Sequence, residues 1–316
     1  MKIVIPDWST MSAVNMGFSV FEEFGEVVCC GMTRPEEAAE KIGDADVVLV
    51  NKTPITAQVM DACPNLKYIG LFATGYNNID IPAATAHGIT VCNAGTYSTD
   101  AVVQHTFALL LSLAGNLPRY EKAVADGEWE RSETFSYFPY PVHELCGKTF
   151  AVIGYGSIGR GVAKVADAFG MRVIVSTRSK PENCPYALVT MDEAFRQADV
   201  LSVHCPLTEQ TAHLINRENL AKMKPEAYLI NTARGGIVDE AALAEALNAG
   251  RLAGAGVDVL DKEPMRPDTP LKAAKNCIIT PHIAWSALET RDRLVQIVAG
   301  NLRNWLEGHP TNQVNG

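Results

Sequence analysis

The sequence lacks the features of several broad classes of protein. Its greasiest stretch, Phe107 to Gly115, is far shorter than the roughly 18 apolar residues that a membrane span requires. Positive charge is not in excess, because 27 lysine and arginine residues face 36 aspartate and glutamate residues, a formal net charge of −9. This balance argues against nucleic acid and anionic membrane as partners. The chain also begins directly with the strand-like Lys2–Ile5, without an export signal, so we expect a cytoplasmic protein.

Paired cysteines and metal motifs are missing as well. The eight cysteines are scattered, without a Cys-x-x-Cys pair or a histidine spacing suited to zinc. A chain of 316 residues can bury roughly three quarters of its surface without such staples. We therefore expect reduced thiols and no metal. A serine hydrolase is disfavoured too, because no Gly-x-Ser-x-Gly turn occurs.

What the sequence does contain is two series of short apolar runs that alternate with helix-like stretches. The first series of expected strands is Ile3–Ile5, Val27–Cys29, Val47–Val50, Tyr68–Leu71 and Ile89–Cys92. The second series is Thr149–Ile153, Arg172–Val175, Val200–Val203, Ala227–Ile230, Gly254–Val257 and Cys277–Ile279. Strands that are apolar on both faces predict parallel sheets covered by helices, hence an α/β fold with two doubly wound domains. A cleft between two such domains is the default place for a ligand.

Four stretches have a clear helical pattern. They are Pro35–Ile42, Ile81–His87 closed by Gly88, a long helix from about Thr99 to Gly115, and a last helix from about Ser286 to Leu306. A polar and aromatic stretch, residues 127–141, follows the long helix.

A glycine-rich turn joins the first strand of the second series to a helix. Gly154, Gly156 and Gly159 form the pattern G-x-G-x-x-G, and Tyr155, Ser157 and Ile158 lie between them. A strand before the turn and a helix after it are the context in which this pattern binds the pyrophosphate of a dinucleotide. A purely structural turn is the alternative.

The residues after the next strand bear on the choice of cofactor. An NAD site usually places Asp or Glu about 20 residues after the glycines, to bind the ribose 2′-hydroxyl. Here Thr177 stands at that strand end, followed by Arg178, Ser179 and Lys180. These basic and hydroxyl groups would suit a 2′-phosphate. NADPH is therefore a plausible cofactor beside NADH, and a solvated basic turn is the alternative.

Seven histidines are candidates for acid–base chemistry. We place His87, His143 and His309 in surface turns or at a helix end, His105 in the core, and His213 at the start of a helix. His204 follows a strand beside the expected cofactor edge, together with Cys205 and Pro206.

His282 differs from the others because two further polar residues follow neighbouring strands. Arg234, Glu263 and His282 come after three successive strands of the second series. Carboxyl ends of parallel strands share one sheet edge, where open α/β sheets bind their ligands. The three side chains should therefore converge on one cleft.

These segments resemble the D-isomer-specific 2-hydroxyacid dehydrogenase family over essentially the whole chain. The resemblance is carried by Gly154–Gly159, His204–Thr208, Asn231–Asp239, Gly256–Val259 and Pro281–His282. It implies a Rossmann dinucleotide-binding domain, a flavodoxin-like substrate domain, and hydride transfer between NAD(H) or NADP(H) and a small 2-keto or 2-hydroxy acid. In that family the arginine binds the keto acid, the histidine donates the proton and the glutamate supports the histidine. Carried over, these residues are Arg234, His282 and Glu263.

The resemblance also implies further contacts. For the cofactor they are Gly154, Tyr155, Gly156, Ser157, Ile158, Gly159, Thr177, Arg178, His204, Cys205, Pro206, Thr211, Thr232, Ala233 and Asp258. Asp258 matches the residue that holds the nicotinamide carboxamide. For the substrate they are Thr74, Gly75, Arg234, His282 and Trp285, with the loop at Thr74 and Gly75 offering backbone N–H groups to the carboxylate.

The family fold implies a split chain. Residues 1–99 would bind substrate together with residues 286–316, and residues 100–285 would bind the dinucleotide. Residues 100–141 resemble the arm through which the family forms homodimers, with packing inside one chain as the alternative.

Within the family, segments such as Tyr97–Thr99 and Ile283–Trp285 resemble the glycerate dehydrogenase, or hydroxypyruvate reductase, branch. Hydroxypyruvate with D-glycerate, or glyoxylate with glycolate, are the expected substrate pairs. D-lactate and phosphoglycerate dehydrogenases are alternatives, the latter disfavoured because the chain stops at Gly316 without a regulatory domain. A non-enzymatic alternative is an NAD-sensing scaffold like the C-terminal-binding-protein corepressors, which carry extensions that this chain lacks.

Overall fold

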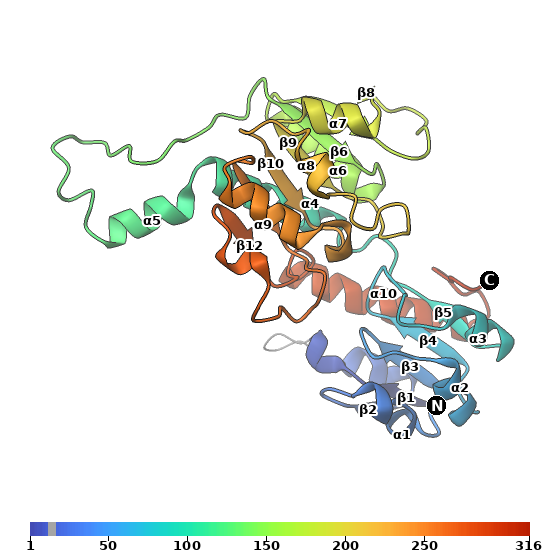
Figure 1. Ribbon diagram of the computed structural model, residues 1–316. Coiled ribbons are helices and arrows are strands. Elements are labelled where there is room, and N and C mark those ends of the chain that lie inside the picture. Colours follow the sequence, from blue (N-terminus) through green and yellow to red (C-terminus); the bar gives the residue numbers. More distant parts are fainter. Residues whose placement is uncertain (12–16) are drawn as a thin grey trace. The chain divides into compact units, whose positions relative to one another are not determined.

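The computed structural model describes residues 1–11 and 17–316, and the chain divides into two units (Figure 1). The first unit comprises Met1–Ser98 and Ser286–Gly316, and the second comprises Thr99–Trp285. Both units are built on parallel sheets, so the predicted α/β fold with two doubly wound domains is confirmed.

The first unit has a five-stranded sheet in the order β2-β1-β3-β4-β5. Its strands are β1 Lys2–Ile5, β2 Glu26–Cys29, β3 Val47–Val50, β4 Tyr68–Leu71 and β5 Thr90–Cys92. This order is the flavodoxin-like arrangement, in which neighbouring loops meet where the strand order reverses. Its helices are α1 Ala38–Ile42, α2 Ala57–Ala62, α3 Ile81–Ala86 and α10 Leu288–Leu306, with 3-10 turns at Trp8–Thr10, Ser19–Phe24 and Pro35–Glu37.

The last helix returns to the first unit because its apolar side covers that sheet. The ring of Trp305 on α10 lies 4.9 Å from the ring of Tyr68 on β4, measured between centroids. Arg293 of α10 also donates to the carbonyl of Tyr97, at 2.9 Å. The two ends of the chain therefore share one core.

The second unit has a seven-stranded parallel sheet in the order β12-β11-β10-β9-β6-β7-β8. Its strands are β6 Thr149–Ile153, β7 Arg172–Ser176, β8 Ala187–Leu188, β9 Val200–Val203, β10 Tyr228–Asn231, β11 Gly254–Val257 and β12 Cys277–Ile279. The order reverses between β6 and β9, which is the switch point of a Rossmann sheet. Ligands of such sheets bind outside the carboxyl ends of the strands at that point.

Helices cover both faces of this second sheet. They are α4 Thr99–Ala114, α5 Leu117–Ala125, α6 Ser157–Ala168, α7 Met191–Gln197, α8 Arg217–Leu220 and α9 Glu240–Asn248, with 3-10 turns at Gly235–Ile237 and Pro270–Ala273. On one face Phe107 of α4 stacks on Phe150 of β6 and on Phe169, with centroids 5.8 and 5.4 Å apart. On the other face Phe195 and Leu243 are fully buried in a second apolar cluster.

The segment after α4 differs from the rest of the second unit. Figure 1 shows α5 and the irregular chain after it extending away from the seven-stranded sheet. Several apolar side chains of this segment are exposed, among them Phe135 at 92%, Phe138 at 84% and Val142 at 63%. We refer to residues 117–142 as the arm.

Two expectations about local structure differ from the structure, and one short strand was not expected. No helix begins at His213, which lies in a turn with a left-handed backbone (φ 49°), and α8 instead begins at Arg217, where the Asn216 side chain caps the backbone N–H of Asn219. The stretch 35–42, expected as one helix, is a 3-10 turn, Pro35–Glu37, followed by a short helix, Ala38–Ile42. The short edge strand β8 was not predicted, since two exposed residues give no periodic signal.

Among the described residues, no single helix is long and apolar enough to cross a membrane. Only α4 and α5 together, bent by 58°, pass by length and composition.

Candidate active site

The glycine-rich turn has the shape that a dinucleotide site needs. A Cβ atom at Gly154, where φ is +91°, would lie 2.7 Å from the backbone of His204 and Cys205, and one at Gly159 would lie 2.1 Å from the carbonyl oxygen of Gly154. These two glycines therefore allow β6, β9 and α6 to approach closely. A Cβ at Gly156 would meet nothing within 4 Å, so the turn faces open space there.

The start of α6 is equally suited to an anion. Gly156 is the N-cap and offers no side chain to the first backbone N–H groups of the helix. Ser157 and Ile158 occupy the first turn. Unsatisfied N–H groups and the positive end of the helix dipole favour a pyrophosphate at such a terminus. These residues fit a dinucleotide cofactor.

A half-buried histidine, His204, follows the neighbouring strand, β9. The Nε2 atom of His204 lies 2.8 Å from the Ser202 hydroxyl, and its Nδ1 atom is buried without a hydrogen-bond partner among the described residues. Burial lowers the pKa of His204 to about 3, so the ring is neutral at physiological pH. An unpaired polar atom at the β6/β9 switch point is a further feature that a bound ligand would satisfy.

The other predicted cofactor contacts lie around this switch point. Thr177 is half-buried and Arg178 exposed, and within the described part of the chain neither Arg178 nor Lys180 forms an ion pair. Tyr155 is buried, with the Arg160 guanidinium 4.6 Å from its ring centroid. Two further predicted contacts follow β9: Cys205 is half-buried and Pro206 is exposed. Two others follow β10: Thr232 is buried and Ala233 is half-buried. Thr211 builds the turn after β9 instead of pointing freely outward, since its hydroxyl donates to the carbonyl of Pro206 at 2.7 Å.

A histidine–carboxylate pair lies at the other end of the same sheet edge. His282 follows β12 and Glu263 follows β11, and the Nδ1 atom of His282 lies 2.6 Å from Oε2 of Glu263. The two side chains are only about one third exposed, at 32% and 37%. The sequence predicted that these residues come together, and the structure brings them within hydrogen-bond distance.

Arg234 stands at the end of the neighbouring strand, β10. Its side chain is exposed, and Nη1 donates to the carbonyl of Ala233 at 2.7 Å. Among the described residues its guanidinium forms no ion pair, so its remaining N–H groups are available for a carboxylate.

Asp258, which follows β11, is buried, and its contact with the nicotinamide stays a prediction. Its side chain is 1% exposed and accepts hydrogen bonds from Thr280 and from the backbone N–H groups of Ile283 and Ala284, at 2.6, 2.9 and 2.8 Å. The carboxylate thus holds the loop that carries His282.

Sequence reasoning missed His105 and Thr280. We expected His105 to be a core residue, but it is half-buried, and its Nε2 atom lies 2.9 Å from the Thr280 hydroxyl. The position of His105 inside an apolar helix indicates a polar partner, but the sequence does not identify Thr280 as that partner.

The predicted substrate residues belong to both units. Thr74 and Gly75 follow β4 in the first unit, where the Thr74 hydroxyl donates to the carbonyl of Gly95. Trp285 is half-buried at the end of the second unit. Their contact with substrate stays a prediction.

The fold and this sheet edge define a nicotinamide-dependent dehydrogenase, and comparison with known proteins gives the family. The D-isomer specific 2-hydroxyacid dehydrogenase NAD-binding domain matches residues 107–284. Hydroxypyruvate reductase of Blautia hydrogenotrophica is 42% identical over all of both chains, and glycerate dehydrogenase of Methylorubrum extorquens is 38% identical over 99% of this chain and 98% of its own. The structure of an NADPH-dependent glyoxylate/hydroxypyruvate reductase from Sinorhizobium meliloti is 30% identical, with a TM-score of 0.85 over 99% of this chain and 97% of its own.

The chain belongs to the D-isomer-specific 2-hydroxyacid dehydrogenase family. It is an NAD(P)-dependent oxidoreductase that transfers a hydride between the nicotinamide cofactor and a small 2-hydroxy acid. The predicted resemblance to the glycerate dehydrogenase and hydroxypyruvate reductase branch is confirmed by these relatives.

Proposed function

We propose that this enzyme reduces hydroxypyruvate to D-glycerate or glyoxylate to glycolate. The observation that carries the proposal is the 2.6 Å contact between His282 and Glu263, in a chain similar over its whole length to a hydroxypyruvate reductase and a glycerate dehydrogenase. In this proposal residues 100–285 bind the dinucleotide, and residues 1–99 with 286–316 bind the substrate.

His282 is the proposed acid. The bound nicotinamide cofactor supplies the hydride to the carbonyl carbon, and the carbonyl oxygen must then take up a proton. Glu263 accepts a hydrogen bond from Nδ1 of His282, so the Nδ1 proton stays on the ring. The proton that His282 donates to the substrate is therefore the one on Nε2. Glu263 also compensates the positive charge of the imidazolium before transfer.

Arg234 is the proposed anchor for the 2-keto acid. Its planar guanidinium can donate two parallel hydrogen bonds to the carboxylate and polarise the neighbouring carbonyl. Thr74 and Gly75 are proposed to offer backbone N–H groups to the same carboxylate.

We further propose that NADPH is accepted at least as well as NADH. Support comes from Thr177 and Arg178, which leave no acidic side chain at the strand end to repel a 2′-phosphate. The S. meliloti relative is itself NADPH-dependent.

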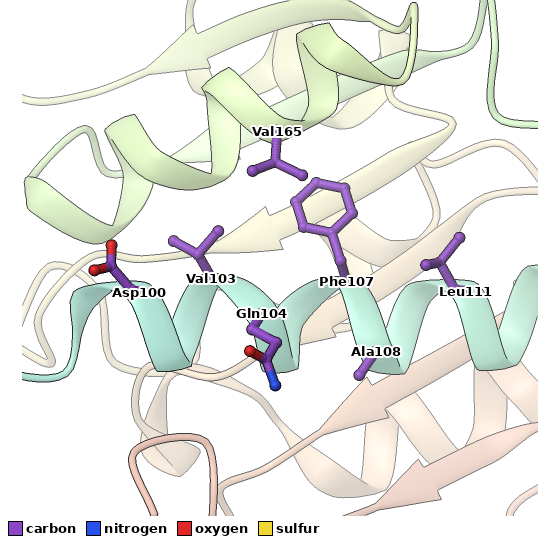
Figure 2. A pocket seen from close by; sticks show the side chains of 7 residues that line it. All are labelled: Asp100, Val103, Gln104, Phe107, Ala108, Leu111 and Val165. Carbon is purple, nitrogen blue, oxygen red and sulfur yellow. The ribbon is translucent and has the colours of Figure 1, made fainter. Parts of the chain in front are cut away.

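We also propose a homodimer that forms through residues 100–141. Support comes from the exposed aromatic side chains of the arm and from an apolar groove along α4, which Figure 2 shows with Phe107 pointing toward Val165 of α6. A cytoplasmic location is proposed because all eight cysteines are unpaired. Sedimentation of the purified protein tests the dimer, and sedimentation as a monomer would refute it.

Steady-state assays of the purified protein test the main proposal. Oxidation of NADPH and NADH should be followed with hydroxypyruvate, glyoxylate and pyruvate as substrates. We expect the highest kcat/KM with hydroxypyruvate or glyoxylate. A clear preference for pyruvate would indicate a D-lactate dehydrogenase, and cofactor binding without turnover of any substrate would favour the corepressor-like scaffold.

A further inference from the structure

A hydrogen-bonded chain connects helix α4 to the loop that carries His282. The Nε2 atom of His105 lies 2.9 Å from the Thr280 hydroxyl, which lies 2.6 Å from Oδ1 of Asp258. Nε2 is also 3.4 Å from the same Asp258 oxygen. Residues 105 and 280 are far apart in the sequence, so these hydrogen bonds join helix α4 to the segment after β12.

The direction of the hydrogen bonds follows from the charge of Asp258. Burial opposes ionisation, but the hydrogen bonds from His105, Thr280 and the backbone N–H groups of residues 284 and 283 hold the pKa of the Asp258 carboxyl below its ordinary value. An ionised carboxylate only accepts, so the Thr280 hydroxyl gives its single proton to Asp258. The Nε2 atom of His105 then faces two acceptors, the Thr280 oxygen at 2.9 Å and the Asp258 oxygen at 3.4 Å, so the proton of that imidazole lies on Nε2.

Asp258 in turn holds the backbone around His282. Its carboxylate accepts from the N–H groups of Ile283 and Ala284, and its own carbonyl accepts from the N–H of His282 at 2.8 Å. His282 has φ +55°, a left-handed conformation that residues other than glycine rarely adopt. Such a backbone persists only where its surroundings hold it.

Helix α4 is a fixed support for this network. A Cβ atom on Gly256 of β11 would lie 2.9 Å from Cβ of Leu109, so α4 packs directly on the strand that leads to Asp258. The Thr106 hydroxyl also lies 3.2 Å from the hydroxyl of Thr232, at the end of β10. His105 is therefore presented to the strand ends by a helix that cannot shift without disturbing the sheet.

We propose that His105 and Thr280 are positioning residues for the reduction: through Asp258 they hold the His282 backbone so that its ring stays paired with Glu263. The inference rests on the proposed role of His282 as the acid. If His105 only filled space, any side chain of similar volume would serve equally well.

Paired substitutions separate these two roles. His105→Gln keeps an N–H donor near the Nε2 position, whereas His105→Leu fills space without a donor. We expect His105→Leu to lower kcat for ketoacid reduction about tenfold, the equivalent of one hydrogen bond, without changing the KM for NADPH. His105→Gln should stay within about threefold of wild type. Equal kcat values for the two variants would overturn the proposal.

Thr280 provides a second test should His105→Leu fold poorly. Thr280→Val has nearly the same shape and should lower kcat about tenfold, while Thr280→Ser keeps the hydroxyl and should not. The double variant His105→Leu/Thr280→Val should be no slower than either single one, because both break the same chain of bonds. Independent, multiplying losses would contradict the network.

A control variant on the same helix addresses stability. Leu113 is buried two turns further along α4, so Leu113→Ala should lower the melting temperature without lowering kcat measured well below it. If Leu113→Ala slows reduction as much as His105→Leu does, the effect is general loosening and the proposal fails.

Amide hydrogen exchange tests the hydrogen-bond network in the absence of substrate. The amide hydrogens of Ile283 and Ala284 should exchange faster in His105→Leu than in wild type, His105→Gln or Leu113→Ala. Unchanged protection would overturn the proposal even if the wild type reduced no 2-keto acid. Conversely, the wild type could turn over no 2-keto acid while His105→Leu still exchanges faster than the wild type. That result would show that the proposed function fails and that the hydrogen-bond network stands.

Discussion

The two units use the same device at the carboxyl ends of their strands. In the first unit Asp7, 1% exposed, accepts from the backbone N–H groups of Asn51, Lys52 and Thr53, at 3.0, 2.5 and 2.7 Å. In the second unit Asp258, also 1% exposed, accepts from two successive backbone N–H groups of the loop after β12. Each buried carboxylate is satisfied by a loop that it thereby fixes in place.

The two carboxylates differ in their side-chain partners. Apart from backbone groups, Asp7 accepts from the hydroxyl of Thr53, within the same loop. Asp258 is joined through Thr280 to His105 on a separate helix, and its loop carries His282 in a left-handed conformation. The two loops are thus fixed in the same way, but only the loop of the second unit carries the proposed proton donor.

Arg234, the proposed substrate anchor after β10, gives the first test of the second unit. We expect Arg234→Lys to lower kcat/KM for the keto acid about 100-fold or more, since an ammonium group cannot form the two parallel hydrogen bonds. Steady-state kinetics with NADPH held saturating measures this. Unchanged kinetic constants would remove Arg234 from the site.

The two buried aspartates can be compared directly. Asp258→Asn should lower kcat about 30-fold, equivalent to about 2 kcal/mol, because the amide cannot accept every bond that the carboxylate accepts. Asp7→Asn, the matched variant in the first unit, should cost stability but change kcat by less than about threefold. Similar kcat losses in both variants would contradict the proposal that only the loop held by Asp258 supports the reaction.

Cofactor choice tests a property of the second unit alone. Thr177→Asp with Arg178→Ala should shift the ratio of kcat/KM for NADPH over NADH toward NADH by about tenfold or more, because a charge-assisted hydrogen bond is lost and a repulsive charge is added. Arg178→Ala alone separates the two contributions. A wild type that strongly prefers NADH, with a ratio unmoved by the double change, would refute the assignment.

A further expected effect concerns the dependence of stability on pH. The pKa of His204 is lowered to about 3 by burial, whereas an unfolded histidine titrates near 6.5. The unfolded chain therefore binds a proton that the folded chain excludes, so stability is lost as the pH falls below about 6.5. The loss should reach roughly 2 kcal/mol between pH 7.5 and pH 5.

Urea unfolding at the two pH values measures that loss. His204→Gln should remove it, whereas His87→Gln, a histidine variant in the first unit, should leave it in place. An equal pH dependence in wild type and His204→Gln would contradict the neutral, buried ring.

Much of this architecture could be predicted from the sequence because the strands are apolar on both faces. β3, β4, β6, β9, β11 and β12 begin and end where the pattern places them. α5 was not predicted; of its apolar residues Leu117 and Val124 are exposed, while Ala123 is buried.

The pairing of His282 with Glu263 could be expected because parallel strand ends share an edge. The support behind it could not be predicted. The bond from His105 to Thr280 depends on where α4 packs, which local sequence does not encode. The left-handed backbone of His282 and the bonds from Asp258 to residues 283 and 284 likewise have no local sequence signal.

A single-turnover measurement on His282→Asn tests the central claim most directly. Enzyme saturated with NADPH is mixed with hydroxypyruvate, and the loss of nicotinamide absorbance is followed, so that binding and product release are separated from the chemical step. The account predicts normal NADPH affinity and a chemical step slower than wild type by about 100-fold to 10,000-fold, because only the proton donor is gone. A step within about threefold of wild type would contradict the claim that the His282–Glu263 pair supplies the proton.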